Sequence, residues 1–222
     1  MKILVVGDYE EKCLWGKWTA EMAAKLSDVD FILSLGDLSS YYLEFLTEKL
    51  NIPLVYVPGN HDIGYIDNPP KRCINADGKI IDLRLNSDNV VQLVRITGLG
   101  GSMRYKDGHY QYSEEEQQSR VEKMLYDLDN NKKIETPDVK ILLTHAPCRG
   151  YGDMDDLAHR GFDCFNKLLE RWKPQVHCYG HVHQEYNDYI VHTMEADGFN
   201  RLLNHPSGTH LINGCGYQFI IV

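Results

Sequence analysis

Three short apolar runs, separated by stretches with helical spacing, constrain the fold of this chain most. The apolar runs are Ile3–Val6, Phe31–Leu35 and Leu54–Val57, and the stretches between them are Leu14–Ser27 and Tyr41–Leu50. Short buried strands that alternate with helices predict a parallel sheet with helical crossovers. We therefore expect a mixed α/β fold.

The remainder of the chain adds further strands and two longer helices. Meandering strands are predicted over Lys79–Leu85 and Asn89–Gly98, buried strands over Val139–Thr144 and Val176–Gly180, and helices over Ser113–Asn130 and Gly161–Trp172. From Asp188 to Val222 the residues alternate without a good helix, which indicates antiparallel strands. No internal repeat or Pro/Gly/Ser-rich linker divides the sequence. We therefore expect a single domain over residues 1–222.

Composition and charge exclude several classes of protein. The 222 residues include 23 Lys+Arg and 32 Asp+Glu, which gives a net charge of −9. This acidic balance argues against broad binding of nucleic acid or of an anionic membrane. No segment approaches the ~20 apolar residues that span a bilayer, and the first apolar run is shorter than a signal-peptide core of ~7–15 residues. The six cysteines form no C-x-x-C pair, so free thiols in a reducing cytoplasm are expected, with disulfides as the alternative.

A residue type that binds metal ions follows each predicted buried strand. In chain order these residues are Asp8 with Glu10, Asp37, Asn60-His61-Asp62, His145, and His181 with His183. Taken singly, each has an ordinary explanation as a turn or as a hydrogen-bonded histidine. In open α/β sheets, however, ligand-binding groups gather outside the carboxyl ends of the strands. Carboxylate, amide and imidazole donors there suit a pair of divalent ions.

This series of motifs resembles the calcineurin-like metallophosphoesterase superfamily. Its blocks D-x-H, G-D, G-N-H-[DE], H and G-H-x-H correspond to Gly7-Asp8, Gly36-Asp37, Gly59-Asn60-His61-Asp62, His145 and Gly180-His181-Val182-His183. His145-Ala146-Pro147 and the uninterrupted length are similar to the small single-domain bacterial phosphohydrolases. The resemblance implies a four-layer αββα sandwich of two mixed β-sheets flanked by helices.

The resemblance also implies a dinuclear site and a reaction. The implied ligands are Asp8, Glu10 and His183 for the first ion, Asn60, His145 and His181 for the second, and Asp37 for both. The cofactors would be two divalent ions, Mn²⁺ or Fe, with Zn²⁺, Ni²⁺ or Mg²⁺ as alternatives. A metal-bridging hydroxide would then attack the phosphorus of a substrate ester. His61 would donate a proton to the leaving oxygen, and its alternative role is only to support the loop.

Two positions depart from the family pattern. Residue 10 is Glu where the pattern has His. Its carboxylate either coordinates the first ion or stands back while a water takes its place. Ser40 stands where the pattern often has an Asp that orients the catalytic histidine. Because a hydroxyl cannot stabilise an imidazolium as a carboxylate does, the orienting partner of His61 is open, and the sequence does not assign that role to Asp62.

Residues near the motifs are candidates for binding substrate. Arg104 follows a Gly-rich turn, Arg149 follows His145 closely, and His159 and Arg160 stand where they could cap the same cleft. Arg104 is equally well explained as a surface residue of a β-turn. The sequence therefore predicts a phosphoesterase acting on a small-molecule phosphate mono- or diester, such as a nucleotide or a cyclic nucleotide. The alternatives are a nuclease of the same superfamily and a non-catalytic metal-binding scaffold.

Overall fold

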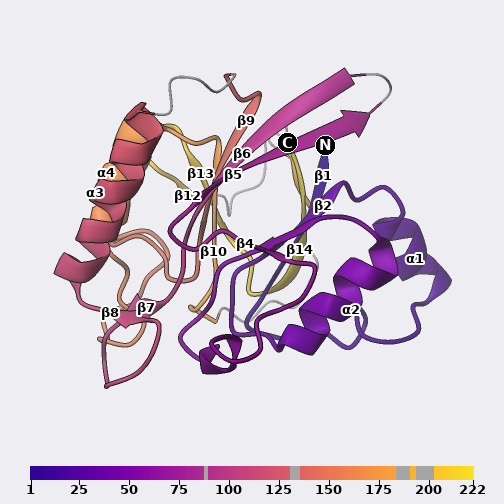
Figure 1. Cartoon of the computed structure of the whole chain (residues 1–222), viewed down its shortest axis with the longest axis horizontal. Helices are drawn as coiled ribbons and strands as arrows, with labels where there is room; N and C mark the ends of the chain where they lie inside the picture. Colours follow the sequence, from indigo (N-terminus) through magenta and orange to yellow (C-terminus); the bar gives the residue numbers. More distant parts are fainter. Residues whose placement is uncertain (88–89, 131–135, 184–190, 194–202) are drawn as a thin grey trace.

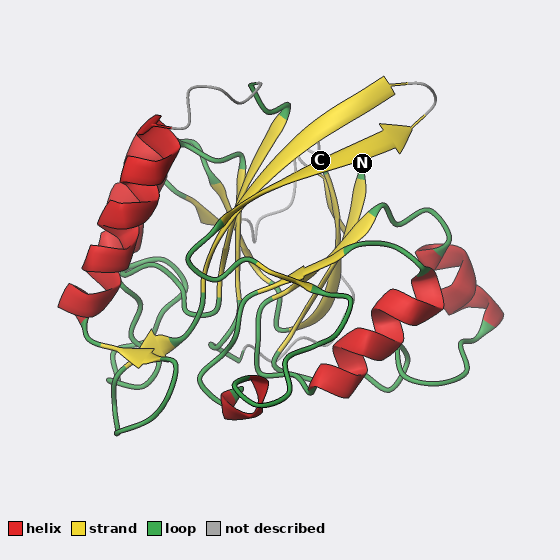
Figure 2. Cartoon of the chain, viewed as in Figure 1, coloured by secondary structure: helices red, strands yellow, loops and turns green. Residues whose placement is uncertain are grey.

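Two mixed β-sheets face one another in the computed structural model, and helices cover both outer sides (Figures 1 and 2). The structure describes residues 1–87, 90–130, 136–183, 191–193 and 203–222. Among the described helices, none combines the length and the apolar character that crossing a bilayer requires.

The first sheet has the strand order β11-β14-β1-β2-β3-β4. Its strands are β1 (Lys2–Gly7), β2 (Phe31–Ser34), β3 (Leu54–Tyr56), β4 (Ile74–Asn75), β11 (Val191–Thr193) and β14 (Gly216–Ile221). Strands β1, β2 and β3 run parallel, and helices α1 (Ala20–Leu26) and α2 (Ser40–Leu50) connect them. This is the strand–helix alternation that the sequence predicts. Strand β14 pairs with the other edge of β1 in the antiparallel direction.

The second sheet has the order β12-β13-β10-β9-β6-β5. Its strands are β5 (Ile80–Ser87), β6 (Val90–Leu99), β9 (Val139–Thr144), β10 (Val176–Tyr179), β12 (Leu203–Asn204) and β13 (His210–Asn213). Strands β6, β9, β10 and β13 run parallel to one another, whereas β5 and β6 form an antiparallel pair. The shorter elements are β7 (Ser102–Met103), β8 (Gln111–Tyr112) and a 3₁₀ turn at Ile63–Tyr65.

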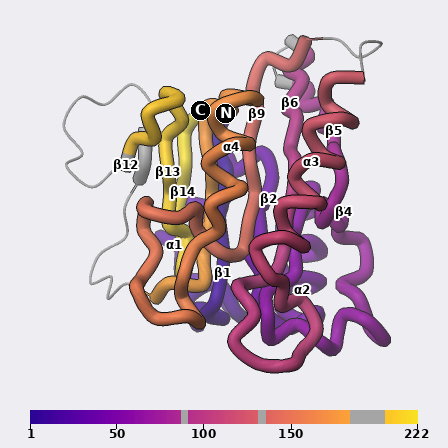
Figure 3. The backbone as a smooth tube through the Cα atoms, turned by 90° about the vertical axis from the view of Figure 1, so that its left-hand side faces the viewer, coloured from indigo at the N-terminus to yellow at the C-terminus, as the bar shows by residue number. Residues whose placement is uncertain are grey.

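Helices α3 (Glu114–Asn130) and α4 (Asp163–Trp172) lie side by side over the second sheet, as Figure 3 shows. A capping box begins α3. The hydroxyl of Ser113 accepts the backbone N–H of Glu116, and the Glu116 carboxylate accepts the backbone N–H of Ser113. Two N–H groups without a helical partner are thereby satisfied, which fixes where the helix starts.

Three apolar clusters account for the layers. Successive residues of a strand point to opposite faces of the sheet, so Val5 lies in the cluster between the two sheets and Leu4 lies in the cluster under α1 and α2. A third cluster, which includes Leu142 and Leu168, joins the outer face of the second sheet to α3 and α4. The expected four-layer αββα sandwich of two mixed sheets is thus confirmed.

Two predicted elements differ from the structure. The helix expected over Leu14–Ser27 begins only at Ala20, because Gly16 has a left-handed φ of 93° and the Thr19 side chain caps the helix start. The expected antiparallel ending is partly wrong. Strand β14 is antiparallel to β1, but β13 runs parallel to β10 and β11 runs parallel to β14. Residues 188–190 and 194–202 of that ending lie outside the described residues.

Candidate metal centre

The loops that follow five strands, three from the first sheet and two from the second, meet around one cavity. These loops follow β1, β2 and β3 on one side and β9 and β10 on the other. The cavity has a volume of about 400 Å³. Its lining includes Asp8, Asp37, Asn60, His61, His181 and His183, together with Tyr105 and His159.

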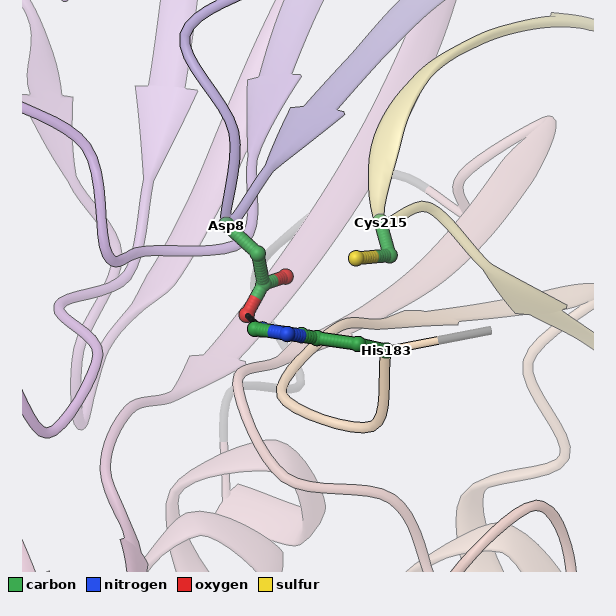
Figure 4. Close-up of side chains that lie close together, drawn as sticks. All are labelled: Asp8, His183 and Cys215. Atoms are coloured by element: carbon green, nitrogen blue, oxygen red, sulfur yellow. Dashed lines mark ion pairs between the residues drawn. The ribbon is translucent and has the colours of Figure 1, made fainter. Parts of the chain in front are cut away.

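Two groups of metal-ligating side chains lie at this cavity. Asp37, His145 and His181 form one group, and Asp8, His183 and Cys215 form the other (Figure 4). Within each group the donor atoms lie within 4.8 Å of one another. Asn60 adjoins the first group, because its Oδ1 lies 2.9 Å from Nε2 of His145. The folding of two sheets therefore brings together six of the seven ligands predicted from the sequence.

Three of these residues have an unusual backbone conformation. The φ angles of Asp8, Asp37 and His181 are 63°, 56° and 67°. Residues other than glycine rarely adopt this left-handed region, and such strain is concentrated at functional sites. The neighbouring glycines are also constrained. A Cβ on Gly59 would collide with the Asp37 carboxylate, and one on Gly180 would collide with that of Asp8. These glycines let the backbone pass close to the acidic side chains.

Backbone carbonyls orient two of the histidines. Nδ1 of His145 donates to the carbonyl of Leu35 at 2.7 Å, and Nε2 of His181 donates to the carbonyl of Ala158 at 2.7 Å. A carbonyl only accepts, so it fixes which ring nitrogen carries the proton. Nε2 of His145 lies 3.5 Å from the Asp37 carboxylate, and in His181 the proton on Nε2 leaves Nδ1 as the nitrogen that could bind an ion. Metal-binding histidines in proteins are typically held through the opposite ring nitrogen in this way.

The charge around the cavity fits a cation. Burial raises the pKa of Asp8, even though its carboxylate accepts the backbone N–H of His181 at 3.0 Å. Burial also raises the pKa of Asp62 to about 7. Burial alone lowers the pKa of His145, but the carboxylates of Asp37 and Asp8 outweigh it and the net pKa is raised. The buried acids therefore favour positive charge, which divalent ions would supply.

Glu10 lies outside both groups of ligands. Its carboxylate accepts the backbone N–H of Ser39, the N-cap residue of α2, at 3.0 Å. The chain turns tightly at Asp8, where the N–H of Tyr9 donates to the carbonyl of Gly7, and Glu10 then meets the positive end of a helix. This position matches the alternative in which Glu10 stands back. Coordination of an ion by Glu10 stays a prediction.

His61 has an exposed side chain at the mouth of the cavity. Its backbone N–H donates to Oδ1 of Asp37 at 2.8 Å. Oδ2 of Asp62 accepts the backbone N–H groups of Gly59 and Asp37 at 2.7 and 2.8 Å, and among the described residues no hydrogen bond joins Asp62 to the imidazole of His61. Asp62 thus holds the two ligand loops together. Ser40 instead accepts a hydrogen bond from Asn68.

The four predicted substrate-binding residues separate into two groups. His159 lines the cavity, and its ring is held by Asp156 at 2.9 Å. The three arginines lie in other interactions. Arg104 pairs with Glu116 at 2.6 Å, Arg149 pairs with Asp153 at 2.8 Å, and Arg160 donates to the carbonyl of Asp155 at 3.2 Å.

Two further residues lie at the site. The sequence places Tyr105 directly after Arg104 at the Gly-rich turn, where it is a candidate donor to phosphate, whereas Cys215 was not found from the sequence. Tyr105 lines the cavity, and its hydroxyl lies 3.4 Å from Nδ2 of Asn60. Cys215 lies between β13 and β14, outside every recognised motif. No local signal marks Cys215. The glycines on both sides of Cys215, Gly214 and Gly216, indicate only a tight turn.

The fold and the donors gathered at the strand ends define a metal-binding α/β sandwich. The model of the family described as calcineurin-like phosphoesterase matches residues 1–185, and the chain belongs to this family. The resemblance inferred from the sequence motifs is thus confirmed. The family is metal-dependent, and its members are phosphoester hydrolases in general.

The chain is also similar to individual proteins. UPF0046 protein T07D4.2 of Caenorhabditis elegans is 26% identical over 216 residues, which cover 82% of this chain and 51% of that protein. The chain thus spans about half the length of this curated relative. The crystal structure of TT1561 of Thermus thermophilus has a TM-score of 0.58 at 14% identity and covers 97% of this chain and 89% of its own. GAP50, titled the anchor in the inner membrane complex of Plasmodium, has a TM-score of 0.50 at 14% identity, with coverages of 82% and 66%. Both structures show a shared fold.

Proposed function

We propose that this chain is a dinuclear-metal-dependent phosphoesterase that hydrolyses a small-molecule phosphate mono- or diester, such as a nucleotide or a cyclic nucleotide. The observation that carries the proposal is the pair of ligand groups at one cavity, with His61 at its mouth. A cavity of about 400 Å³ lies within the range of small-molecule sites, ~300–1,000 Å³. The net charge of −9 disfavours the nuclease alternative.

Each ligand group would hold one divalent ion. Asp37, Asn60, His145 and His181 would hold one, and Asp8 and His183 would hold the other, with Asp37 between them. Mn²⁺ or Fe is our first choice for these ligands, and Zn²⁺, Ni²⁺ and Mg²⁺ are the alternatives. When bound, such ions activate water and stabilise negative charge on phosphoryl oxygens.

The side chains of the protein would position and protonate the substrate. His61 would donate a proton to the leaving oxygen, a role that suits an imidazole at neutral pH. The hydrogen bond from its backbone to Asp37 supports this role, because it ties His61 to the ligand loops. His159 faces the same cavity and would contact the phosphate ester. All six cysteines are free thiols, which supports our proposal of a cytoplasmic protein.

The test is metal-dependent hydrolysis by the whole chain. We expect the Mn²⁺-loaded protein to cleave bis(4-nitrophenyl) phosphate or 4-nitrophenyl phosphate, and Asp37→Asn to lose about 100-fold or more of this activity. Asp28→Asn is the matched control, because Asp28 is an exposed carboxylate paired with Lys2. Equal activities of the wild type and Asp37→Asn would contradict the proposal.

The same assay separates the alternatives. Fold alone does not imply function, and an anchor protein shares this fold. Binding of metal without turnover on any phosphoester would favour the non-catalytic scaffold. Salt-dependent binding of DNA, measured by fluorescence anisotropy, would favour the nuclease.

A further inference from the structure

Cys215 lies where the two sheets meet at the candidate metal centre. It follows β13 of the second sheet and precedes β14 of the first. In the antiparallel pair of β1 and β14, Gly7 lies opposite Gly216. The next residues outward along this register are Asp8 and Cys215, so strand pairing sets the thiol beside a predicted metal ligand. Cys215 lies outside the residues that the family model matches, 1–185.

The donor atoms of Cys215, Asp8 and His183 form a compact group. They lie within 4.8 Å of one another, and Nε2 of His183 lies 3.4 Å from Oδ1 of Asp8. Figure 4 shows the sulfur directed toward the Asp8 carboxylate. In a tetrahedral site, metal–ligand bonds of ~2.0–2.3 Å place the donors of one ion about 3.3–3.8 Å apart. Donor atoms 4.8 Å apart would therefore have to approach one another by about 1–1.5 Å to bind one tetrahedral ion.

A buried amide fixes the thiol relative to the histidine segment. Oδ1 of Asn213 accepts the backbone N–H of Cys215 at 3.0 Å, and Nδ2 of Asn213 donates to the carbonyl of Val182 at 2.8 Å. Val182 stands between His181 and His183. One side chain thus anchors the Cys215 turn to the segment that carries two other candidate ligands, as expected for a preorganised metal site.

The surroundings of Cys215 differ from those of three other buried cysteines. Cys148, Cys164 and Cys178 belong to the apolar clusters of the core, whereas the described clusters do not include Cys215. Its thiol adjoins Asp8, and burial and the nearby carboxylates raise its pKa. Cys215 is therefore buried beside a carboxylate and not within one of the apolar clusters.

We propose that Cys215 is a thiolate ligand of the ion held by Asp8 and His183, and that it supplies the donor that Glu10 does not. The inference rests on the proposed function, because it takes the metal centre as its starting point. On binding, the S–H bond breaks, a bond from sulfur to the ion forms, and the proton leaves to solvent. A divalent ion offsets the effect of burial, since a coordinated thiol is deprotonated.

A sulfur ligand would change the choice of metal at this site. Thiolate favours Zn²⁺, Fe and other softer ions, whereas Mg²⁺ and Mn²⁺ prefer oxygen donors. The ligands that the family resemblance implies for this ion included the oxygen donor Glu10 in addition to Asp8 and His183. With Glu10 at the N-terminus of α2 and Cys215 beside Asp8, we expect this site to favour Zn²⁺ over Mg²⁺.

X-ray absorption spectroscopy of the Zn²⁺-loaded whole chain tests the inference. We expect a sulfur scatterer at about 2.3 Å from zinc in the wild type and its loss in Cys215→Ser. The Co²⁺-loaded wild type should also show a sulfur-to-cobalt charge-transfer band in the near ultraviolet. Cys73→Ser is the matched control and should keep both signals, because Cys73 donates to the carbonyl of Lys71 away from the site.

The outcomes separate this inference from the proposed function. Zinc bound without a sulfur scatterer in the wild type overturns the role of Cys215, whether or not Cys215→Ser folds. If that protein still hydrolyses phosphoesters, the proposed function stands. A sulfur scatterer in a protein that hydrolyses no phosphoester would support Cys215 as a metal ligand and would contradict the proposed phosphoesterase function. A chain that binds no Zn²⁺ or Co²⁺ contradicts both.

Discussion

The hydroxyl of Tyr9 lies 2.8 Å from Nδ1 of His183, although 174 positions separate the two residues in the sequence. Their rings are also in contact, with centroids 4.8 Å apart. The other ring nitrogen of His183 faces Asp8 at 3.4 Å. Because His183 is half-exposed, this hydrogen bond is what fixes the direction of its metal-facing nitrogen. Tyr9 is therefore a positioning residue for the candidate metal centre.

Replacing Tyr9 with Phe should weaken metal binding without unfolding the protein. The variant keeps the ring contact and removes only the hydroxyl, and loss of such an outer hydrogen bond typically lowers metal affinity by about 10-fold. Isothermal titration with Zn²⁺ measures this change. Tyr41→Phe is the control, because Tyr41 is an exposed tyrosine on α2. Unchanged affinity in Tyr9→Phe would show that the Tyr9 hydroxyl does not orient His183.

His61→Ala should separate metal binding from proton donation. We expect the variant to keep its metal content and to lose about 10²–10⁴-fold in turnover of an alkyl phosphoester. The loss on a nitrophenyl ester should be smaller, because that leaving group departs without a proton. Steady-state kinetics on both esters, with metal content measured by mass spectrometry, provide the comparison. Equal losses on the two esters would argue against the acid role.

His159→Ala and Arg104→Ala should affect substrate binding differently. His159 lines the cavity, so its loss should raise KM by about tenfold, the effect of one hydrogen bond to a charged group. Arg104 is paired with Glu116 at 2.6 Å and borders a separate cavity of about 580 Å³. Its removal should leave KM within about twofold. A larger KM effect in Arg104→Ala would restore this arginine as a substrate contact.

His177 should make the fold sensitive to acid. Its Nε2 donates to the hydroxyl of Thr144 at 2.7 Å, and that hydroxyl donates to the carbonyl of Ala146. Burial, with a smaller effect of His205, lowers the pKa of His177 from 6.5 to about 3. In the unfolded chain His177 therefore becomes protonated below about pH 6.5. In the folded chain it becomes protonated only near pH 3. Stability is lost as the pH falls through this range, by at most about 1.4 kcal/mol per pH unit.

The variant His177→Gln tests this acid sensitivity. Glutamine keeps a donor for Thr144 but does not titrate, so its free energy of unfolding should fall less between pH 6.5 and 4.5. Urea unfolding followed by circular dichroism measures the difference. His210→Gln is the control, because His210 is partly exposed at the start of β13. Parallel pH profiles for the wild type and His177→Gln would contradict the assignment.

Local patterns in the sequence were sufficient for the mixed α/β fold and for most of the cavity, whereas the sandwich of two sheets was implied by the resemblance to the family. Buried runs such as Ile3–Val6 and Leu54–Val57 mark strands, and parallel strands bring their carboxyl ends together. Residues directly after those ends, such as Asp37 and Asn60, must therefore meet. The late start of α1 has a local cause as well, since Gly16 and Thr19 both interrupt the helical spacing.

The remaining features depend on partners that are distant in sequence. Glu10 lies close enough to the end of the first strand to be predicted as a ligand. Its carboxylate instead accepts a hydrogen bond from the backbone N–H of Ser39, which is distant in the sequence. Arg104 forms a salt bridge with Glu116 on α3, and the Gly-rich turn before Arg104 does not indicate this partner. Cys215 reaches the site through the antiparallel register of β1 and β14, which no spacing rule predicts.

The cavity draws its walls from both sheets, and this has a mechanical consequence. Asp8 and Asp37 belong to loops of the first sheet, and His145 and His181 belong to loops of the second. Between the sheets lies an apolar layer, and apolar contacts are not directional. Ions bound at the shared edge would act as cross-links that restrict any movement of one sheet relative to the other. Loading with metal should therefore slow amide hydrogen exchange in β2 of the first sheet and in β9 of the second sheet together.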